Sequence, residues 1–271
     1  MTKKPRSSSY RSRAASTPTT RASSKKILRE REVSRKVFVR GIPSAISFEL
    51  VRVGDSYGII YEMVRARTLS QVFQSQPERL EEYATRMAAL LRTLHTTEFE
   101  EGELPDARQV MHMWVSIAER SGMCPAETIA KMRAAIDAIP SGNKFIHGDF
   151  HTANIMVTDD GELVLIDMGD ASMGDPLIDL ALSAQIMLVM QQNPQALRRY
   201  TSLDPEQMSR VWNTFIRAYC DTDDDARIGE IERRLELTKT AHPFLETVCQ
   251  ASKRSATAAL TLRRPQRGRR P

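Results

Sequence analysis

Residues 147–155 read HGDFHTANI, and an apolar run that ends in Leu165-Ile166-Asp167 follows them. The first stretch places a carboxylate, Asp149, five residues before an amide, Asn154. A second carboxylate, Asp167, comes thirteen residues after that amide. These three oxygen-bearing side chains, spaced along a loop and a strand end, make this part of the chain decisive for the fold.

The chemistry of Mg²⁺ explains why such residues would recur together. Mg²⁺ is a hard cation that takes oxygen ligands, usually one or two protein carboxylates together with phosphates and water. Asn154 and Asp167 can supply two such oxygens. Asp149, if it does not bind the metal, is free to accept a hydroxyl proton and to orient a nucleophile. The separation of Asp149 and Asn154 is also that of the base and the metal ligand in a protein-kinase catalytic loop.

The segment between the two motifs predicts a β-hairpin. Residues 155–166 form two apolar runs that are joined by Asp160-Gly161, and an Asp-Gly pair between such runs favours a hairpin turn. A rigid hairpin would carry Asn154 and Asp167 to one cleft. Taken singly, Asp149 and Asn154 could be turn residues that satisfy backbone groups. Their combined spacing to Asp167 favours a metal and phosphate site instead.

Residues 147–181, which contain HGDFHTANIMV and LVLIDMGDASMGDPLIDLA, resemble the aminoglycoside phosphotransferase and choline kinase family. These are small-molecule kinases with a protein-kinase-like fold. The resemblance implies ATP and Mg²⁺ as cofactors and a small-molecule hydroxyl as the acceptor. It also implies that Asp149 is the catalytic residue and that Asn154 and Asp167 are the Mg²⁺ ligands.

The same resemblance assigns supporting residues around the loop. It implies that His147 and His151 brace the loop, and that Asp175 and Asp179 belong to a second element that supports it and begins a helix. By residue type alone, Asp175 is more simply a structural hydrogen-bond acceptor at a turn. His95, on an apolar helix without a second ligand at metal spacing, is predicted to be a packed core histidine.

The region before the motif predicts a partial N-terminal lobe over residues 27–66. A helix is expected from 27 to 40 because Gly41-Ile42-Pro43 is a stop signal, and two antiparallel strands are expected at 46–53 and 57–63. The resemblance implies three cofactor-binding residues in this lobe. Glu30, with Glu32 as the alternative, would pair with the ATP lysine, while Glu62 and Met63 would lie in a hinge at 61–64 that meets the adenine.

A kinase-like N-lobe also needs a glycine-rich strand pair and a lysine upstream of that helix. Residues 1–26 contain no glycine and no strand-like apolar run. We therefore expect a truncated N-lobe, or a chain whose start is misassigned or frameshifted. Two functions follow: an active phosphotransferase, or a catalytically weak or inactive pseudokinase that binds and regulates.

Residues 67–252 predict a larger helical C-lobe, so the expected class is a two-lobed, protein-kinase-like α+β fold with a catalytic hairpin. One apolar face recurs every three to four residues at Leu80, Tyr83, Met87, Leu90, Leu91 and Leu94, which is typical of a core helix. Further helices are expected at 106–120, 126–138, 176–192, 205–220 and 228–241, with Asp204 as an N-cap.

Charge is distributed unevenly along the 271 residues, whose formal net charge is +5. Residues 1–26 and 253–271 hold 15 of the 39 basic residues and no acid, so residues 27–252 hold 24 basic and 34 acidic residues. Both ends are predicted to be disordered basic tails. Nucleic-acid binding through them would be a third function, but solvated termini are favoured. The acidic run 221–225 could attract a cationic substrate, although a solvated helix start is favoured.

Cysteine content and hydropathy indicate a cytoplasmic protein without membrane contact. Cys124, Cys220 and Cys249 are far apart and odd in number, which fits a reducing compartment. The longest apolar stretch, 177–190, is too short to span a bilayer, and no apolar segment of a secretory signal follows the first lysines. Aminoglycosides, choline-like alcohols, sugars, amino-acid hydroxyls and protein side chains all remain open as acceptors, and no feature fixes an oligomeric state.

Overall fold

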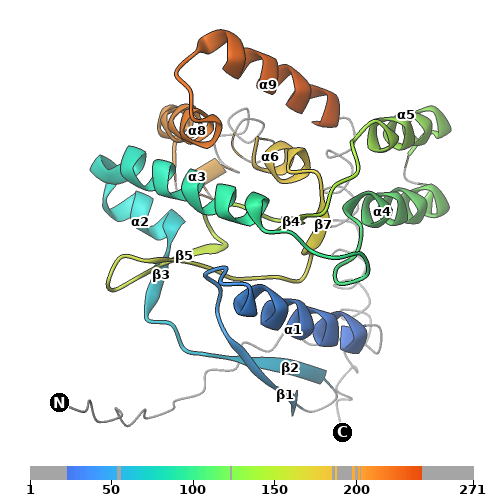
Figure 1. The fold of residues 1–271 in the computed structure, drawn as a ribbon, viewed down its shortest axis with the longest axis horizontal. Helices are drawn as coiled ribbons and strands as arrows, with labels where there is room; N and C mark the ends of the chain where they lie inside the picture. The colour runs from blue at the N-terminus through green and yellow to red at the C-terminus, as the bar shows by residue number, and fades with distance from the viewer. Residues whose placement is uncertain are drawn as a thin grey trace, which may run out of the picture.

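The structure, a computed structural model, describes residues 23–53, 56–122, 124–184, 187, 197, 198, 201 and 203–239. A small part holds helix α1 (Ser23–Val39) and an antiparallel ribbon of β1 (Ser47–Val53) and β2 (Ser56–Tyr61). A larger, mainly helical part follows (Figure 1). The predicted α+β class with two unequal lobes is therefore confirmed.

Helix α1 begins earlier than the sequence predicted and ends where it predicted. It starts at Ser23, inside the stretch 1–26 that was expected to be a disordered tail. It stops before Gly41, whose φ of +78° is a left-handed conformation that favours glycine. The rest of both predicted tails, and the turn at residues 54 and 55, lie outside the described residues. The helix packs on the ribbon and buries Val33 and Val37 in the main core.

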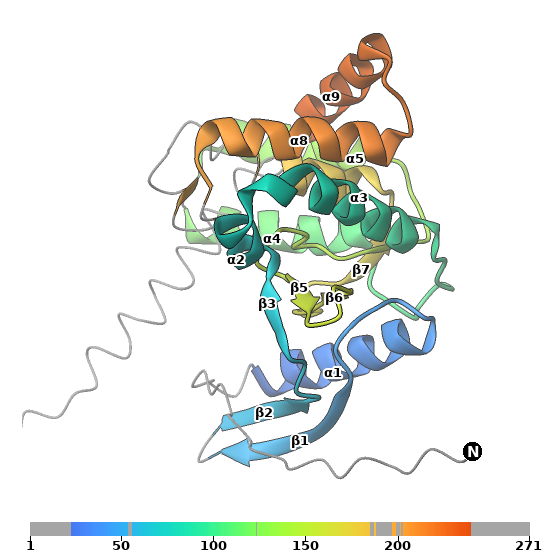
Figure 2. The ribbon, with the colours of Figure 1, turned by 90° about the vertical axis from the view of Figure 1, so that its left-hand side faces the viewer.

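The N-lobe ribbon is attached to the C-lobe through the segment between α1 and β1. Leu165 donates its N–H to the Pro43 carbonyl (2.8 Å) and accepts from the Ala45 N–H (3.1 Å). After β2 the chain passes through strand β3 (Ala66–Thr68) into the C-lobe (Figure 2). The small lobe thus meets the large one at the same hairpin that carries the predicted metal ligands.

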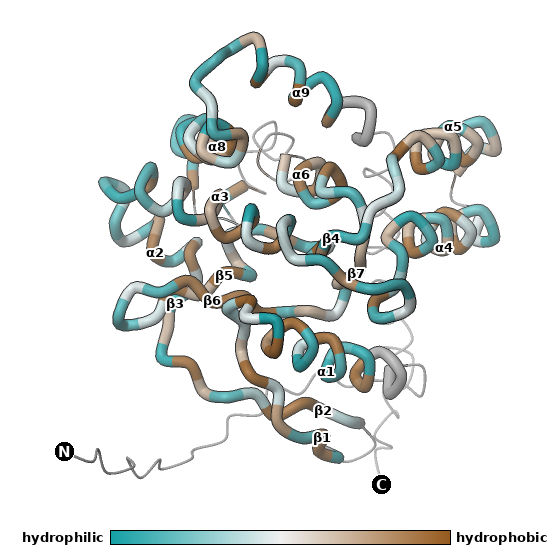
Figure 3. Tube along the Cα trace, viewed as in Figure 1, coloured by the Kyte–Doolittle hydropathy of each residue, from teal (hydrophilic) through white to brown (hydrophobic). Residues whose placement is uncertain are grey.

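The C-lobe core forms mainly between helices α3 (Leu80–Thr96) and α8 (Pro205–Cys220). Every residue of the predicted apolar face of α3 is buried, which confirms that prediction: Leu80, Tyr83, Met87, Leu90, Leu91 and Leu94. Full burial of one such side chain contributes about 1.5–3 kcal/mol. Apolar residues of these helices face inward in the hydropathy colouring (Figure 3).

The remaining helices surround that core. They are α2 (Leu69–Ser75), the 3₁₀ turn η1 (Pro77–Arg79), α4 (Ala107–Ser121), α5 (Ala126–Asp137), α6 (Leu177–Ala184) and α9 (Asp225–Lys239). The predicted N-cap of α8 is confirmed, since Asp204 accepts from the Gln207 N–H (2.9 Å). The predicted helix 176–192 is described to residue 184, and most of its remainder lies outside the described residues.

Two small sheets hold the ends of the predicted active-site loops. The hairpin of β5 (Ile155–Thr158) and β6 (Leu163–Leu165) is joined by β3, and β4 (Lys144–Ile146) pairs with β7 (Ser172–Gly174). Loop 147–154 therefore runs from β4 to β5, and loop 166–171 runs from β6 to β7. Because both ends of both loops are fixed by strand pairing, the two loops lie side by side.

No described helix is both long enough and apolar enough to cross a membrane. Cys124 and Cys220 are free thiols, and Cys249 lies outside the described residues. The acidic run 221–225 makes local contacts between α8 and α9. Asp224 accepts from the Ala226 N–H (2.9 Å), and Asp225 pairs with Arg217. These contacts agree with the favoured interpretation of a helix start.

Candidate active site

The buried carboxylate of Asp179, in the first turn of α6, anchors loop 147–154 through hydrogen bonds. Asp179 accepts the backbone N–H of His147 (2.7 Å) and that of Gly148 (2.8 Å), and it is fully buried. Hydrogen bonds to a charged acceptor in a dry environment are among the strongest in proteins. Asp179 therefore fixes the start of the loop, as the resemblance implied.

His95 completes the environment of this carboxylate. Its Nε2 lies 3.3 Å from an Asp179 oxygen, and its Nδ1 lies 2.7 Å from the Tyr219 hydroxyl. Burial above all raises the pKa of Tyr219, so the phenol stays protonated and donates. His95 is itself buried, which confirms the prediction of a packed core histidine. Its partnership with Asp179 joins residues 84 positions apart and has no local sequence signal.

His147 ties the loop to the end of β6. Its Nε2 lies 3.2 Å from the Ile166 carbonyl, and its Nδ1 accepts from the Asp149 N–H (3.3 Å). The carbonyl can only accept, so Nε2 carries the proton that links the ring to Ile166. His147 thus links the two loops directly.

Asp149 is held by Asn154 and His151 with its carboxylate partly exposed. The Asn154 amide nitrogen donates to the Asp149 carbonyl and to its Oδ2, both at 2.9 Å. His151 accepts from the Ala153 N–H at Nδ1 (3.1 Å), which directs Nε2–H toward Asp149 Oδ1 at 3.4 Å. Burial acts to raise the pKa of Asp149, but the His151 hydrogen bond and charge, together with His147 and Asn154, outweigh it and lower that pKa.

The hairpin brings Asn154 and Asp167 to one end, as the sequence predicted. Ile155 pairs with Leu165, and the Ile166 N–H donates to the Asn154 carbonyl (3.1 Å). Asp167 follows immediately with a φ of +61°, a conformation that non-glycine residues rarely adopt and that is concentrated at functional sites. Its side chain is exposed to the solvent.

The donor set fits Mg²⁺ that is completed by phosphate. The Asn154 amide nitrogen is used by Asp149, which leaves its carbonyl oxygen for a cation, and Asp167 adds an exposed carboxylate. Among the described residues, no three His, Cys, Asp or Glu side chains form a closed metal cage. Open, oxygen-only coordination of this kind is usual for Mg²⁺, which keeps waters and takes phosphate oxygens.

Close packing of the two loops requires glycine at position 148. Gly148 has a φ of +80°, and a Cβ there would lie 2.6 Å from the Asp170 carbonyl oxygen. Asp175, by contrast, accepts from the Leu177 N–H (2.8 Å) and so caps α6. Its implied role in supporting the loop stays a prediction, with Asp179 as the residue that makes the direct contact.

On the N-lobe side, Glu30 meets Tyr61 rather than standing free on the helix. The Tyr61 hydroxyl, at the end of β2, donates to Glu30 Oε1 (2.8 Å). Burial raises the pKa of Tyr61 most, and the carboxylates of Glu30 and Asp167 raise it further. Glu30 and Tyr61 are therefore partners, and Tyr61 was not among the residues that the sequence singled out.

The predicted hinge begins where β2 ends. The Glu62 N–H donates to the Ile46 carbonyl (2.9 Å), and Glu62 Oε1 accepts from the Ile46 N–H (3.0 Å), so this side chain is engaged within the lobe. Met63 is 67% exposed. Within the described chain, no backbone partner is found for Met63 or Val64. Adenine contacts by Glu62 and Met63 stay a prediction.

Comparisons with known proteins agree with this geometry. The profile of the phosphotransferase enzyme family matches residues 11–211. An aminoglycoside-3′-phosphotransferase of type VIII is 20% identical, with a TM-score of 0.56 over 80% of this chain and 82% of the other. An aminoglycoside phosphotransferase from Streptomyces rimosus, solved with ADP and streptomycin, is 19% identical, with a TM-score of 0.54 over 81% and 85%.

A third similar structure is an ethanolamine kinase from Plasmodium vivax, which is 16% identical with a TM-score of 0.52 over 82% of this chain and 65% of the other. A comparison with curated protein sequences gave no match. The structural likenesses show a protein-kinase-like fold of the kind seen in small-molecule kinases. The family profile adds the class of activity, that of a phosphotransferase. The chain belongs to the phosphotransferase enzyme family.

Proposed function

We propose that this protein transfers the γ-phosphate of ATP, with Mg²⁺, to a hydroxyl group of a small molecule. One observation carries the proposal: a single hairpin and its two adjoining loops bring Asp149, Asn154 and Asp167 together. Each loop is fixed at both ends by strand pairing, which suits chemistry that depends on positioning.

Asp149 would orient the acceptor. Its carboxylate is partly exposed, and its pKa lies below the ordinary value of 3.8, so it is ionised at neutral pH. Such a weak base accepts a hydrogen bond from an alcohol and takes the proton only as the oxygen begins to bond to phosphorus. His151 and Asn154 keep the carboxylate pointed in one direction.

Asn154 and Asp167 would hold the metal. Mg²⁺ bound there would neutralise charge on the phosphates. Glu30 with Tyr61, and the backbone at Glu62 and Met63, would face the nucleotide from the N-lobe side.

An acceptor that carries amines is the first class to screen. Residues 27–252 are acidic overall, which favours cationic molecules. Two proteins of similar fold bear names that indicate such molecules, streptomycin in one and ethanolamine in the other. Amino alcohols and aminoglycosides therefore form the panel, with neutral sugars as the contrast set.

The test combines binding and turnover. Calorimetry with ATP and Mg²⁺ should give metal-dependent binding by the wild type, and Asp167→Asn should abolish it. Asp149→Asn should still bind nucleotide but lose about 10²–10⁴-fold in turnover on the best acceptor. Asp159→Asn, at the exposed tip of the hairpin, is the matched control and should leave both unchanged.

Each outcome has a defined meaning. Absence of nucleotide binding by folded wild-type protein would overturn the proposal. Metal-dependent binding without turnover on any acceptor would support the alternative, a regulatory pseudokinase. Equal losses in Asp149→Asn and Asp159→Asn would show that the effect comes from charge and not from the site.

A further inference from the structure

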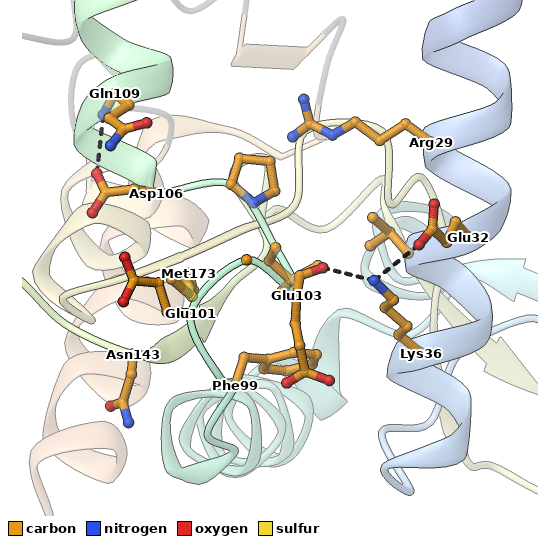
Figure 4. A pocket seen from close by; sticks show the side chains of 14 residues that line it. Arg29, Glu32, Lys36, Phe99, Glu101, Glu103, Asp106, Gln109, Asn143 and Met173 are labelled. Atoms are coloured by element: carbon orange, nitrogen blue, oxygen red, sulfur yellow. Dashed lines mark hydrogen bonds and ion pairs between the residues drawn. The ribbon is translucent and has the colours of Figure 1, made fainter.

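A groove of about 710 Å³ separates α1 from the C-lobe on the side away from the hinge. Its walls are α1, the loop 99–106 and Met173 of β7 (Figure 4). Arg29 reaches across one end of this groove, and Lys36 reaches across its middle toward Glu103. The groove is therefore bridged by cationic side chains from one helix.

These cations form a stripe on α1. Arg29 and Lys36 are seven residues apart, which places them on one face of α1, and Arg40 follows directly after the last residue of that helix. Lys36 Nζ donates to the Glu103 carbonyl (2.9 Å), and Arg40 pairs with the Glu103 carboxylate (2.6 Å). Arg29 differs in its target, because its Nη2 donates to the Ala171 carbonyl (3.1 Å) in the loop that follows Asp167.

The arrangement of Arg29 is not explained by stability alone. Its Nε is buried and has no hydrogen-bond partner among the described residues. A buried donor without a partner loses its hydration, and this loss offsets the benefit of the bond that Nη2 makes. Native structures usually avoid such atoms, so we take this one as a reason to look for a role beyond folding.

The position of Ala171, whose carbonyl accepts the Arg29 bond, indicates what that role is. Its N–H donates to the Met168 carbonyl (3.3 Å) and closes a turn that begins just after Asp167. Asp167 itself has the left-handed φ of +61°, and Gly148 packs against the Asp170 carbonyl in the same turn. The residue that follows Arg29 is Glu30, whose carboxylate accepts a hydrogen bond from the Tyr61 hydroxyl.

We propose that Arg29 is a positioning residue that holds the turn 167–171 against α1 and thereby presents Asp167 to the metal. The inference rests on the proposed function, because that function makes Asp167 a metal ligand. Two adjacent residues of α1 then act together: Arg29 fixes the loop that carries Asp167, and Glu30 fixes the strand that enters the hinge. A displacement of α1 would move both sides of the nucleotide site at once.

The test compares Arg29→Met with Lys36→Met. Both variants keep an aliphatic chain and remove one bond from α1 to a C-lobe carbonyl, but only Arg29 contacts the turn after Asp167. Hydrogen exchange of the peptide covering 167–171, without ligand, should be about tenfold faster in Arg29→Met and unchanged in Lys36→Met. Calorimetry with ADP and Mg²⁺ should show about tenfold weaker binding in Arg29→Met alone.

Arg29→Lys, which keeps the charge but not the planar guanidinium, should fall between the wild type and Arg29→Met in both measurements. Unchanged exchange at 167–171 in Arg29→Met, or equal changes in both methionine variants, would overturn the inference. If the wild type binds no nucleotide, the proposed function fails, while the exchange measurement still decides whether Arg29 holds the turn. Should Arg29→Met not fold, the exchange of Arg29→Lys against Lys36→Met decides.

Discussion

Loop 147–154 and the N-lobe ribbon differ in how the rest of the chain holds them. Loop 147–154 rests on a fully buried carboxylate, a histidine that links it to the neighbouring loop, and strands at both ends. The described part of the ribbon has two strands, and it leaves Phe48, Tyr57 and Ile60 more than one-third exposed. A two-stranded ribbon is only marginally stable by itself in water.

The two regions correspond to the two sides of the proposed active site. The side proposed to orient the acceptor and hold the metal is fixed by buried hydrogen bonds and by strand pairing at both ends of its loops. The side proposed to face the nucleotide depends on α1, which is joined to the rest of the molecule by buried Val33 and Val37 and by a few cationic side chains. We expect substitutions in the first region to cost stability, and substitutions in the second to cost little stability.

The largest effect is expected from Asp179→Ala. It would leave two backbone N–H groups and His95 without their shared acceptor in a buried place. Loss of one member of such a buried network typically costs about 3–5 kcal/mol in the free energy of unfolding. Chemical denaturation measures this cost.

Asp175→Ala, in the same helix start, is the matched control because it removes only a cap, which is worth about 1 kcal/mol. If both variants lose the same stability, the loop is not held by Asp179 in the way described, and the contrast between the two regions weakens.

An intermediate effect is expected from Gly148→Ala. Alanine would have to adopt the left-handed backbone conformation. Its Cβ would also clash with the Asp170 carbonyl oxygen, which would lie 2.6 Å away. Gly161→Ala, in the hairpin turn, has a φ of +88° but open space around the new Cβ. The control should lose about 1–2 kcal/mol, from the backbone alone, and Gly148→Ala should lose more.

Thermal or urea unfolding of the two glycine variants gives the difference directly. A difference near zero would mean that the two loops part easily, and would contradict the close packing on which the Asp149 to Asp167 arrangement depends.

The sequence predicted the hairpin around the candidate site well because its information is local. Asp149, Asn154 and Asp167 are connected by one hairpin, so their spacing and an Asp-Gly turn suffice to bring them together. The turn itself is longer than an Asp-Gly pair, since Thr158 closes it on Gly161 and Glu162. The N-cap of α8 and the apolar face of α3 could also be predicted, because each is formed by residues within a few turns of one helix.

The contacts on the N-lobe side could not be predicted, since they join distant parts of the chain. Glu30 and Tyr61 are 31 residues apart, and Arg29 and Ala171 are 142 apart. The Glu62 carboxylate accepts from the Ile46 N–H, sixteen residues earlier in the chain, which no local pattern indicates. Such partners depend on how α1 is placed on the C-lobe, and no spacing rule encodes that placement.

The smallest effect on stability is expected from Tyr61→Phe, in the N-lobe. The substitution removes the hydroxyl that donates to Glu30 and keeps the ring that packs beneath α1. A partly buried hydrogen bond to a carboxylate contributes on the order of 1 kcal/mol, so unfolding should shift only slightly.

Nucleotide binding should respond more strongly, because Tyr61 holds Glu30, which is proposed to face the nucleotide. Tyr57→Phe is the matched control on the same strand, since that ring is 47% exposed and its hydroxyl is free of partners among the described residues. Calorimetry with ADP and Mg²⁺ should show weaker binding for Tyr61→Phe and wild-type binding for Tyr57→Phe. If Tyr61→Phe instead lost several kcal/mol of stability, the ribbon would be part of the rigid core, and the contrast between the two regions would not hold.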